Sequence, residues 1–344
     1  MKRAILLAII GSVLYIPLFS TRLGVELSFQ PVWSADPAGG PDPGESHTLY
    51  PYHSGSLFGF VGDDGRIAFH DRVIDSVAMS ASGFINYSTV GISLLLQDSR
   101  GSVQNVLDTR GYPQFIGNRL YVISTNRTRL EEWSLDGDRL WTHEFASLIT
   151  AIDSAAGWTV VGQLDGRMQL FDAEGNIAHE QMFENSKTHI VYGVGISDAA
   201  DTIAIVHGLG PQNLTLLRNG ESGYAEVFSI ELDEAFRENR LVYASTEYVH
   251  LEARDSILSI SISDGVTAHA ARLPGRMIDF GSAAELDWFA ATGDDTIHLS
   301  FTAHSGATFA LSAAKSGGIK VIADGSSILV STDDNIGRID LVRK

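Results

Sequence analysis

The sequence predicts an all-β fold in which one four-stranded unit is repeated around a closed ring. Two observations carry this prediction. A strand–turn–strand phrase recurs along the chain, and a second kind of strand recurs at a spacing of about 40 residues. Recurrence at a nearly fixed period is typical of architectures that stack one supersecondary unit many times. The repeats therefore predict the fold, and the strands at the two ends of the chain predict how the ring closes.

The recurring phrase joins two alternating apolar strands through a turn rich in Asp and Gly. It is clearest at residues 58–72, 130–145 and 168–183, which read FGFVGDDGRIAFHDR, LEEWSLDGDRLWTHEF and MQLFDAEGNIAHEQMF. Weaker copies begin at Leu258 and Leu299. Glycine permits the positive φ that a tight hairpin needs, and aspartate bonds its own backbone in such turns. Each copy therefore predicts a β-hairpin.

The second kind of strand predicts the number of units. It begins at Phe84, Leu120, Trp158, Thr202, Tyr248, Trp288 and Ser327, at successive spacings of 36, 38, 44, 46, 40 and 39 residues. Four strands with their turns need about 40 residues, the size of one β-propeller blade. A strand of small residues precedes each copy, as at 76–80, and small residues suit the crowded axis of a ring. Seven copies predict a seven-bladed β-propeller.

The two chain ends are expected to complete one blade between them. The folded body is predicted to begin with the hairpin at 57–72, and it ends with inner strands at 319–332 and a further run at 336–342. Pairing of the N- and C-terminal strands would close the ring and remove two exposed sheet edges. The sequence leaves open whether the last run and the strand near Phe58 compete for one position or one of them adds a fifth strand.

Three segments are expected along the chain. Residues 1–20 carry Lys2 and Arg3 before an apolar run at 4–19, the order of a signal peptide or an uncleaved membrane-anchor helix. Residues 21–54 include a Pro/Gly-rich stretch and predict a flexible tether, and residues 55–344 predict the propeller. We expect an exported protein. It faces the periplasm from the inner membrane if the run stays uncleaved, and it is periplasmic if the signal is cleaved.

Composition excludes several classes of function. The chain has 42 acidic and 24 basic residues and a net charge of −18, which disfavours binding to nucleic acid and to anionic lipid headgroups. It has no cysteine, which excludes disulfides, thiolate metal sites and a cysteine nucleophile. No Asp-x-Asp-x-Asp loop, Gly-x-Ser-x-Gly elbow or metal-ligand spacing of histidines is present. The sequence therefore predicts no catalytic residue, no metal site and no cofactor.

Two segments resemble a known repeat. Residues 133–141 read WSLDGDRLW, and residues 170–175 read LFDAEG. These resemble the repeat of the pyrroloquinoline-quinone-like β-propellers and, more loosely, the WD40-like superfamily. The resemblance implies a propeller whose tryptophan wedges between blades. Catalytic members of the family bind the quinone with Ca²⁺, usually against a tryptophan and a vicinal cystine. The absence of cysteine here implies a non-catalytic member.

The longest spacings, 44 and 46 residues, indicate where a partner binds, because extra loop length usually gathers on one face of a repeat protein. Basic residues are scarce in this acidic chain, so those near predicted loops stand out. The candidate partner-binding residues are Asn126, Arg127, Arg129, His207, Pro211, Arg237, Arg254 and Arg276. The alternative interpretation is that they lie in ordinary solvated turns.

Two hypotheses of function remain. In the first, the chain is a non-catalytic interaction platform for another protein of the bacterial cell envelope. It resembles, in class only, the propeller subunit of the outer-membrane β-barrel assembly machinery. That subunit is a lipoprotein, so the missing cysteine argues against equivalence. In the alternative, the central funnel makes the protein an enzyme or a binder of a small ligand, a sugar or a quinone. The alternative predicts polar residues from several blades converging at one mouth. The sequence leaves the oligomeric state open.

Overall fold

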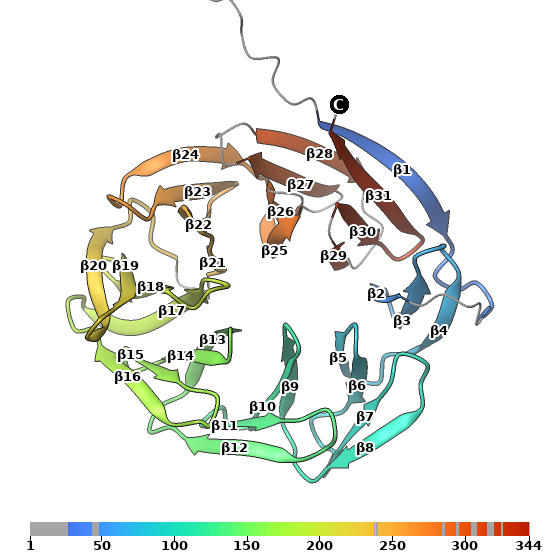
Figure 1. Cartoon of the computed structure of the whole chain (residues 1–344), viewed down its shortest axis with the longest axis horizontal. Coiled ribbons are helices and arrows are strands. Elements are labelled where there is room, and N and C mark those ends of the chain that lie inside the picture. Colours follow the sequence, from blue (N-terminus) through green and yellow to red (C-terminus); the bar gives the residue numbers. More distant parts are fainter. Residues whose placement is uncertain are drawn as a thin grey trace, which may run out of the picture.

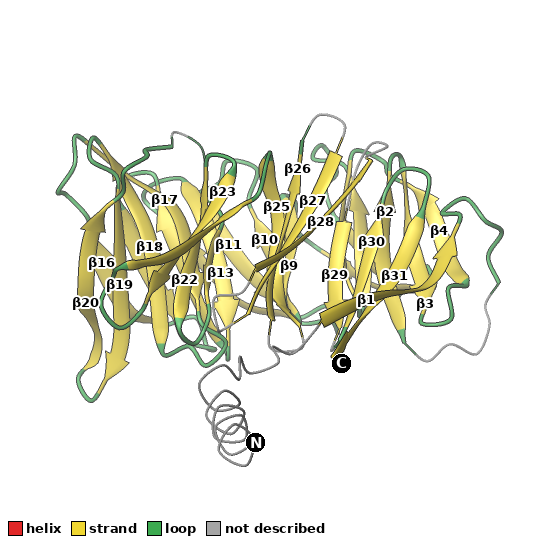
Figure 2. Ribbon diagram, turned by 90° about the horizontal axis from the view of Figure 1, so that it is seen from above, coloured by secondary structure: helices red, strands yellow, loops and turns green. Residues whose placement is uncertain are grey.

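The protein is described here by a computed structural model, which covers residues 27–42, 48–236, 238, 240–283, 286–293, 296–303, 308–314, 320–324 and 326–343. These residues form eight antiparallel sheets, which stand as blades around a central axis (Figure 1). Seen at right angles, the strands run between two edges of the ring and the loops gather along those edges (Figure 2). No helix within these ranges is long and apolar enough to cross a membrane. The helix expected at residues 1–20 lies outside the described residues.

The first four blades follow the chain in order. Blade I contains β2 (Leu49–Ser54), β3 (Leu57–Gly62) and β4 (Ile67–Arg72). Blade II contains β5 (Ser76–Ser80), β6 (Gly83–Tyr87), β7 (Leu94–Gln97) and β8 (Val103–Leu107). Blade III contains β9 (Tyr112–Ile116), β10 (Arg119–Ile123), β11 (Arg129–Trp133) and β12 (Arg139–Glu144). Blade IV contains β13 (Ile149–Ala155), β14 (Trp158–Gln163), β15 (Arg167–Phe171) and β16 (Ile177–Met182).

The remaining blades continue around the ring, and the last one joins the two chain ends. Blade V contains β17 (Thr188–Ile196), β18 (Thr202–Leu209), β19 (Asn213–Gly220) and β20 (Gly223–Glu231). Blade VI contains β21 (Val242–Ala244), β22 (Tyr248–Ala253), β23 (Ser256–Ser261) and β24 (Thr267–Arg272). Blade VII contains β25 (Arg276–Ala283), β26 (Leu286–Thr292), β27 (Thr296–Ala303) and β28 (Thr308–Ala314). Blade VIII contains β29 (Lys320–Asp324), β30 (Ser327–Ser331), β31 (Ile336–Arg343) and, as its outermost strand, β1 (Leu27–Ala35).

The prediction of seven blades is wrong, because the structure has eight. The seven strands that set the predicted spacing are the second strands of blades II to VIII. The missed blade is blade I, whose β2 reads LYPYHS and is buried along most of its length, as the other second strands are. Its start at Leu49 lies 35 residues before Phe84, so it is an eighth copy of the same series. The hairpin β3–β4 belongs to this blade and not to the one that closes the ring.

The segment 21–54, expected to be a tether, supplies two of the propeller strands, β1 and β2. Both strands contain a proline, which argues against a central strand because proline cannot donate a hydrogen bond to a neighbouring strand. Both lie at a sheet edge, where proline is tolerated: β1 is the outermost strand of blade VIII, and β2 is an edge strand of blade I. The pairing of β1 shifts its register between Pro31 and Trp33. The propeller therefore begins at β1 and not at residue 55.

The ring closes by antiparallel pairing of β1 with β31, from Leu27 opposite Arg343 to Ala35 opposite Ile336. A C-terminal strand thus pairs with an N-terminal one, as expected, but the N-terminal partner precedes the expected hairpin. Closure extends to blade I, because the Trp33 indole Nε1–H donates to the Asp63 carbonyl (2.8 Å). On the opposite edge, the Ser54 hydroxyl donates to the Asp333 carbonyl (2.6 Å).

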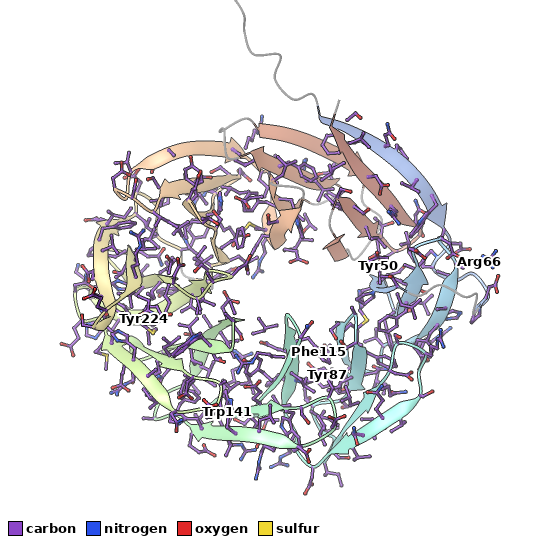
Figure 3. All side chains as sticks on the ribbon, in the orientation of Figure 1. Tyr50, Arg66, Tyr87, Phe115, Trp141 and Tyr224 are labelled. Atoms are coloured by element: carbon purple, nitrogen blue, oxygen red, sulfur yellow. The ribbon has the colours of Figure 1, made fainter. Side chains whose placement is uncertain are left out.

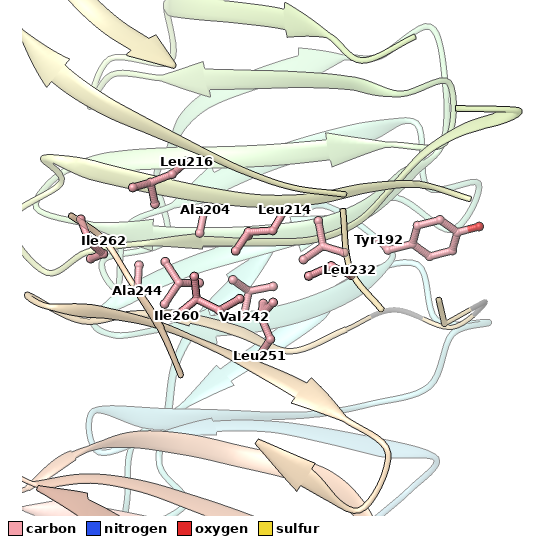
Figure 4. Packing of buried hydrophobic residues seen from close by; sticks show 12 residues of the cluster. Tyr192, Ala204, Leu214, Leu216, Leu232, Val242, Ala244, Leu251, Ile260 and Ile262 are labelled. Carbon is pink, nitrogen blue, oxygen red and sulfur yellow. The ribbon is translucent and has the colours of Figure 1, made fainter. Parts of the chain in front are cut away.

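Eight apolar clusters fill the eight contacts between neighbouring blades. Figure 4 shows the cluster between blades V and VI, in which Leu214 and Leu216 face Val242 and Leu251. The β-branched and leucine side chains alternate along each strand and so cover both faces of every blade. An unbroken series of eight clusters means that each blade is buried on both sides, so the core is itself a ring.

A repeated joint links the outer strands of successive blades. The glycine in the turn between the third and fourth strands of one blade packs against a side chain on the fourth strand of the blade before it. At Gly175 of blade IV, φ is +81° and an added Cβ would lie 2.5 Å from the Trp141 ring of blade III. Trp141 is therefore a wedge between blades, as predicted. The same joint recurs in the pairs Gly65–Trp33, Gly101–Phe69, Gly137–Asn105 and Gly265–Phe228.

Replacing Gly175 with alanine is expected to destabilise the protein by about 2–4 kcal/mol, because the substitution adds a clash with Trp141 to the strain of a positive φ. Gly223 is the matched control, since its φ is +97° but nothing lies within 4 Å of an added Cβ. Gly223→Ala should cost only about 1 kcal/mol. Urea denaturation monitored by tryptophan fluorescence measures both. Equal losses would show that the joint contributes nothing beyond backbone conformation.

Candidate functional site

One edge of the ring carries most of the residues that the sequence singled out. All blades repeat the same antiparallel strand order, so loops that join second to third strands emerge on one edge, together with loops that lead into the next blade. We call this edge the cavity face. In the described residues it includes the loops at 108–111, 124–128, 210–212, 254–255 and 273–275.

Six of the eight candidate residues lie on the cavity face or at the strand ends that border it. Asn126 and Arg127 are exposed in one turn, and Arg254 and Arg276 are exposed near blades VI and VII. The two remaining members of the six, Arg129 and Pro211, are half-buried. Arg129 is held by Glu131, with its Nε 3.1 Å from a carboxylate oxygen. Arg237 lies outside the described residues. The structure therefore brings residues from four blades to one surface.

His207 is not part of that surface, because its side chain is fully buried at the end of β18. Its ring stacks on Phe183 at 4.0 Å between centroids, and its Nε2 lies 2.8 Å from the Thr215 hydroxyl oxygen. Burial lowers the pKa of His207 to about 4, so the ring is neutral at physiological pH. His207 is therefore a histidine of the core, and it is neither an exposed partner-binding residue nor part of a solvated turn.

A cavity of about 450 Å³ opens among the inner strands at the cavity face. Its walls come from blades II to VII, and Figure 3 shows one wall residue, Tyr87, at the inner side of its blade. The polar and aromatic members of the wall are Tyr87, Tyr112, Gln114, Arg127, Thr150, Asp153, Arg240 and Phe280. Polar groups from several blades thus converge on one space, which is the arrangement that the funnel hypothesis requires.

Two arginines are among the residues that line this cavity. Arg127 has a positive φ of 57° in its turn, and its guanidinium carbon lies 5.6 Å from the Tyr112 ring centroid. Arg240 precedes β21 and is only 4% exposed. Its Nη2–H donates to the Glu234 carbonyl (2.7 Å), and its guanidinium lies 4.0 Å from the Phe236 ring centroid. Burial lowers the pKa of Arg240 to about 10, so the side chain is still cationic at neutral pH.

Asp153 on β13 is the acidic group of the cavity. Its carboxylate oxygens accept hydrogen bonds from the backbone N–H groups of Ser154 (2.8 Å) and Ile196 (2.9 Å), and the second of these links blades IV and V. Burial raises the pKa of Asp153 to about 6, against the opposing effect of the two N–H donors. The carboxylate is therefore half protonated about one pH unit below neutrality, and its charge can be changed in a mild buffer.

The raised pKa of Asp153 predicts a pH dependence of stability. Above pH 6 the group is ionised in both states, and burying the charge destabilises the fold. As pH falls from about 6 to about 4 the folded state binds the proton first, and the penalty disappears. When the pH is lowered from 7.5 to 4, the unfolding free energy of the wild-type chain should rise by about 2 kcal/mol relative to that of Asp153→Asn. Urea titrations at several pH values test this, and a constant difference would contradict the raised pKa.

A buried chain of Ser259, His250 and Asp287 joins blades VI and VII. His250 Nδ1 lies 2.9 Å from the Ser259 hydroxyl oxygen, and His250 Nε2 lies 3.0 Å from an Asp287 carboxylate oxygen. The three residue types are those of a hydrolase triad, but none is more than 4% exposed, so the serine hydroxyl has no path to a substrate. We interpret the chain as a polar tie between blades.

The sequence did not single out Tyr87, Tyr112, Asp153, Arg240 or Phe280. The sequence did contain a signal for four of them. Tyr112, Asp153 and Phe280 lie on the first strand of a blade, and Arg240 lies just before one. First strands meet at the axis of a propeller, so their polar and aromatic residues are candidates for a central cavity. No group of three or more His, Asp or Glu side chains suited to a metal ion occurs within the described ranges.

The comparisons with known proteins agree with this architecture. A family profile described as "beta-propeller protein" matches residues 1–344. The chain is 24% identical over 249 residues to an uncharacterized protein of Treponema pallidum, a match that covers 68% of this chain and 65% of the length of that protein. The crystal structure of BamB from Moraxella catarrhalis superposes with a TM-score of 0.65 at 12% identity, over 91% of this chain and all of that one. The sequence repeats, the closed ring of blades and the family match together show that this chain belongs to the β-propeller protein family.

Proposed function

We propose that this chain is a non-catalytic β-propeller that serves as a protein-interaction platform in the bacterial cell envelope. The observation that carries the proposal is the gathering of Asn126, Arg127, Arg254 and Arg276 as exposed residues on one face. Arginine is enriched among the residues that dominate binding energy at protein interfaces. In a chain with a net charge of −18, exposed arginines on one face give a partner a distinct electrostatic target.

The placement in the envelope rests on residues 1–20, whose two basic residues precede an apolar run. We propose that this segment exports the chain, either as an inner-membrane anchor through residues 4–19 or as a cleaved signal. The likeness in fold to BamB supports a propeller of the platform kind. The wedge formed by Trp141 supports the finer assignment to the pyrroloquinoline-quinone-like repeat.

Site-specific photocrosslinking in living cells tests the platform. A photoreactive amino acid is placed at Asn126 or Arg254 on the cavity face, and at Asp64 or Asp138 in turns of the opposite face, all exposed. We expect a discrete adduct with an envelope protein from the first two positions only. Adducts of equal yield from both faces, or from neither, would refute the platform on this face.

A second function is favoured by the cavity itself. A space of about 450 Å³ is in the range of small-molecule sites, and it combines aromatic walls with an acid of raised pKa. We therefore also propose that the central cavity binds a small ligand. Thermal shift of the purified chain against sugars, sugar acids and quinones tests this, and an unchanged melting temperature with every class would count against it.

A further inference from the structure

We propose that the outer edge of β8 is an interface between two copies of this chain, which pair antiparallel through this strand and form a dimer. The edge lies on the outer rim of the ring (Figure 1), so the inference is separate from the partner surface proposed for the cavity face. It rests on the free edge of the strand, on its sequence, on the apolar side chains beside it and on the charges at its two ends.

β8 has a strand partner on one side only. It is the outermost strand of blade II, and it pairs with β7. Its other side presents backbone N–H and C=O groups that no strand within the described ranges satisfies. Such an edge is complementary to another extended strand. Two identical strands that pair antiparallel are related by a two-fold axis, so the edge can satisfy its own copy, and the assembly then closes as a dimer.

The sequence of β8 lacks the features that keep most exposed edges from pairing. Proteins usually protect such edges with charged residues or proline. β8 reads VQNVL and contains neither. β1 is also uncharged, but it carries Pro31 and a register shift next to it. Five other outermost strands carry charge: Asp71 and Arg72 in β4, Arg139 and Glu144 in β12, Glu180 in β16, Glu226 and Glu231 in β20, and Arg272 in β24.

Exposed apolar side chains lie beside this edge. Leu95 on β7 lies directly opposite Val106, and Val103 lies opposite Gln97. Cross-strand partners share a face of the sheet, and Leu95 and Gln97 are two residues apart, so Leu95, Val103 and Val106 lie on one face. Their exposed fractions are 44%, 57% and 59%. A second copy of β8 continues this apolar face across the interface and removes part of it from water.

The charges at the two ends of β8 favour an identical strand as the partner. Arg100 precedes the strand, and Asp108 follows it. Both side chains are exposed, and neither forms an ion pair within the described part of the chain. Antiparallel pairing brings Arg100 of each copy beside the partner subunit's Asp108, twice by symmetry. Asp98 and Arg110 make each end neutral overall, so the ends of two copies do not repel.

β28 is the outermost strand that most resembles β8, because it reads TFALSAA and also lacks charge and proline. Residues 297–323 contain no Asp or Glu, however, so the ends of β28 lack the complementary charges. The end charges therefore distinguish the edge of β8 from that of β28.

The test uses the full-length chain, which has no cysteine, with one cysteine introduced at a time. Gln104→Cys is exposed on β8, and Val227→Cys is the matched control, exposed on the outermost strand β20 beside Glu226. We expect a short bismaleimide to yield covalent dimer from Gln104→Cys at least about fivefold more efficiently than from Val227→Cys. Sedimentation velocity of the wild-type chain should show a dimer at micromolar concentration.

Three further variants in the Gln104→Cys chain test the pairing itself. Val106→Lys should lower the yield of dimer about fivefold, because lysine protects a strand edge. Arg100→Asp should lower it about threefold by placing two carboxylates side by side, and Arg100→Asp/Asp108→Arg should restore it. All three positions are exposed, and circular dichroism checks that each variant folds.

The proposal is overturned if the wild-type chain stays monomeric at about 100 μM, or if Gln104→Cys and Val227→Cys crosslink equally. It is also overturned if the dimer persists in Val106→Lys, or if the double charge reversal does not restore it. None of these results bears on the partner surface of the cavity face, which the photocrosslinking experiment tests separately.

Discussion

Deleting residues 1–35 is expected to open the ring and leave a chain that no longer folds cooperatively. The deletion removes β1, so β31 loses its outer partner along eight paired positions. It also removes Phe29, whose ring lies 5.1 Å from that of Phe301, and Trp33, which packs on Gly65 of blade I. Lost hydrogen bonds and buried area together amount to roughly 5–10 kcal/mol, comparable to the whole stability of a typical domain.

The matched control begins at residue 27 and keeps β1 intact. Melting temperature, far-UV circular dichroism and size-exclusion chromatography should show a folded, non-aggregated chain for the control and an aggregating or partly unfolded chain for the longer deletion. Trp33→Ala is the intermediate variant, with an expected loss of about 3 kcal/mol. If the longer deletion melted within a few degrees of the control, closure through β1 would not be what stabilises the ring.

Arg119→Met is expected to destabilise the protein by about 3–5 kcal/mol, because it leaves a buried carboxylate without its counter-charge. The Arg119 guanidinium donates two hydrogen bonds to Glu132, at 2.7 Å to Oε1 and 2.5 Å to Oε2. It also donates to the Ser154 hydroxyl and to the Trp158 carbonyl of the next blade. The ion pair is therefore a link between blades III and IV as well as a charge pair.

The double variant Arg119→Met/Glu132→Leu removes both charges and is expected to recover part of the loss. The recovery is incomplete because the Trp141 indole N–H, which donates to Glu132 at 2.6 Å, then lacks an acceptor. Arg66→Met is the surface control: Arg66, labelled at the rim in Figure 3, is 58% exposed and its ion pair with Asp42 is solvated. It should change stability by less than about 1 kcal/mol. A double variant no more stable than the single one would contradict this account.

Most of the fold was predictable because each blade repeats the same local chemistry. The second strands at Leu120, Trp158 and Thr202 lie where the spacing predicted them, and the strand at 76–80 is innermost, as its small residues indicated. The predicted number of blades was too low by one, because the copy of the second strand at Leu49 was not recognised. In LYPYHS, Pro51 resembles a strand breaker, and the Pro/Gly-rich stretch before it resembles a tether. Proline disrupts strand pairing only when its missing N–H faces a neighbouring strand. Whether it does so depends on which strands lie at a sheet edge, and the sequence does not show this for β2.

The candidate site was predictable in outline only. Loop length and scarce basic residues selected Arg127, Arg254 and Arg276, which the structure brings to one face as exposed residues. Arg240 was missed because its distinguishing feature is burial, and burial depends on contacts between segments that are far apart in the chain. His207 was misplaced for the same reason, since a histidine at the end of a strand is as compatible with the core as with a loop.

The pairing of Leu27 with Arg343 has a consequence for how the molecule is made. The strand that closes the ring, β1, is translated about 300 residues before its partner β31, so complete closure must wait until β31 has been made. Until then β1 has no sheet to join, and loop closure over more than 300 residues makes this step slow. At high concentration a finished β31 can accept β1 from another molecule, and crowded expression should therefore yield strand-exchanged dimers alongside monomers.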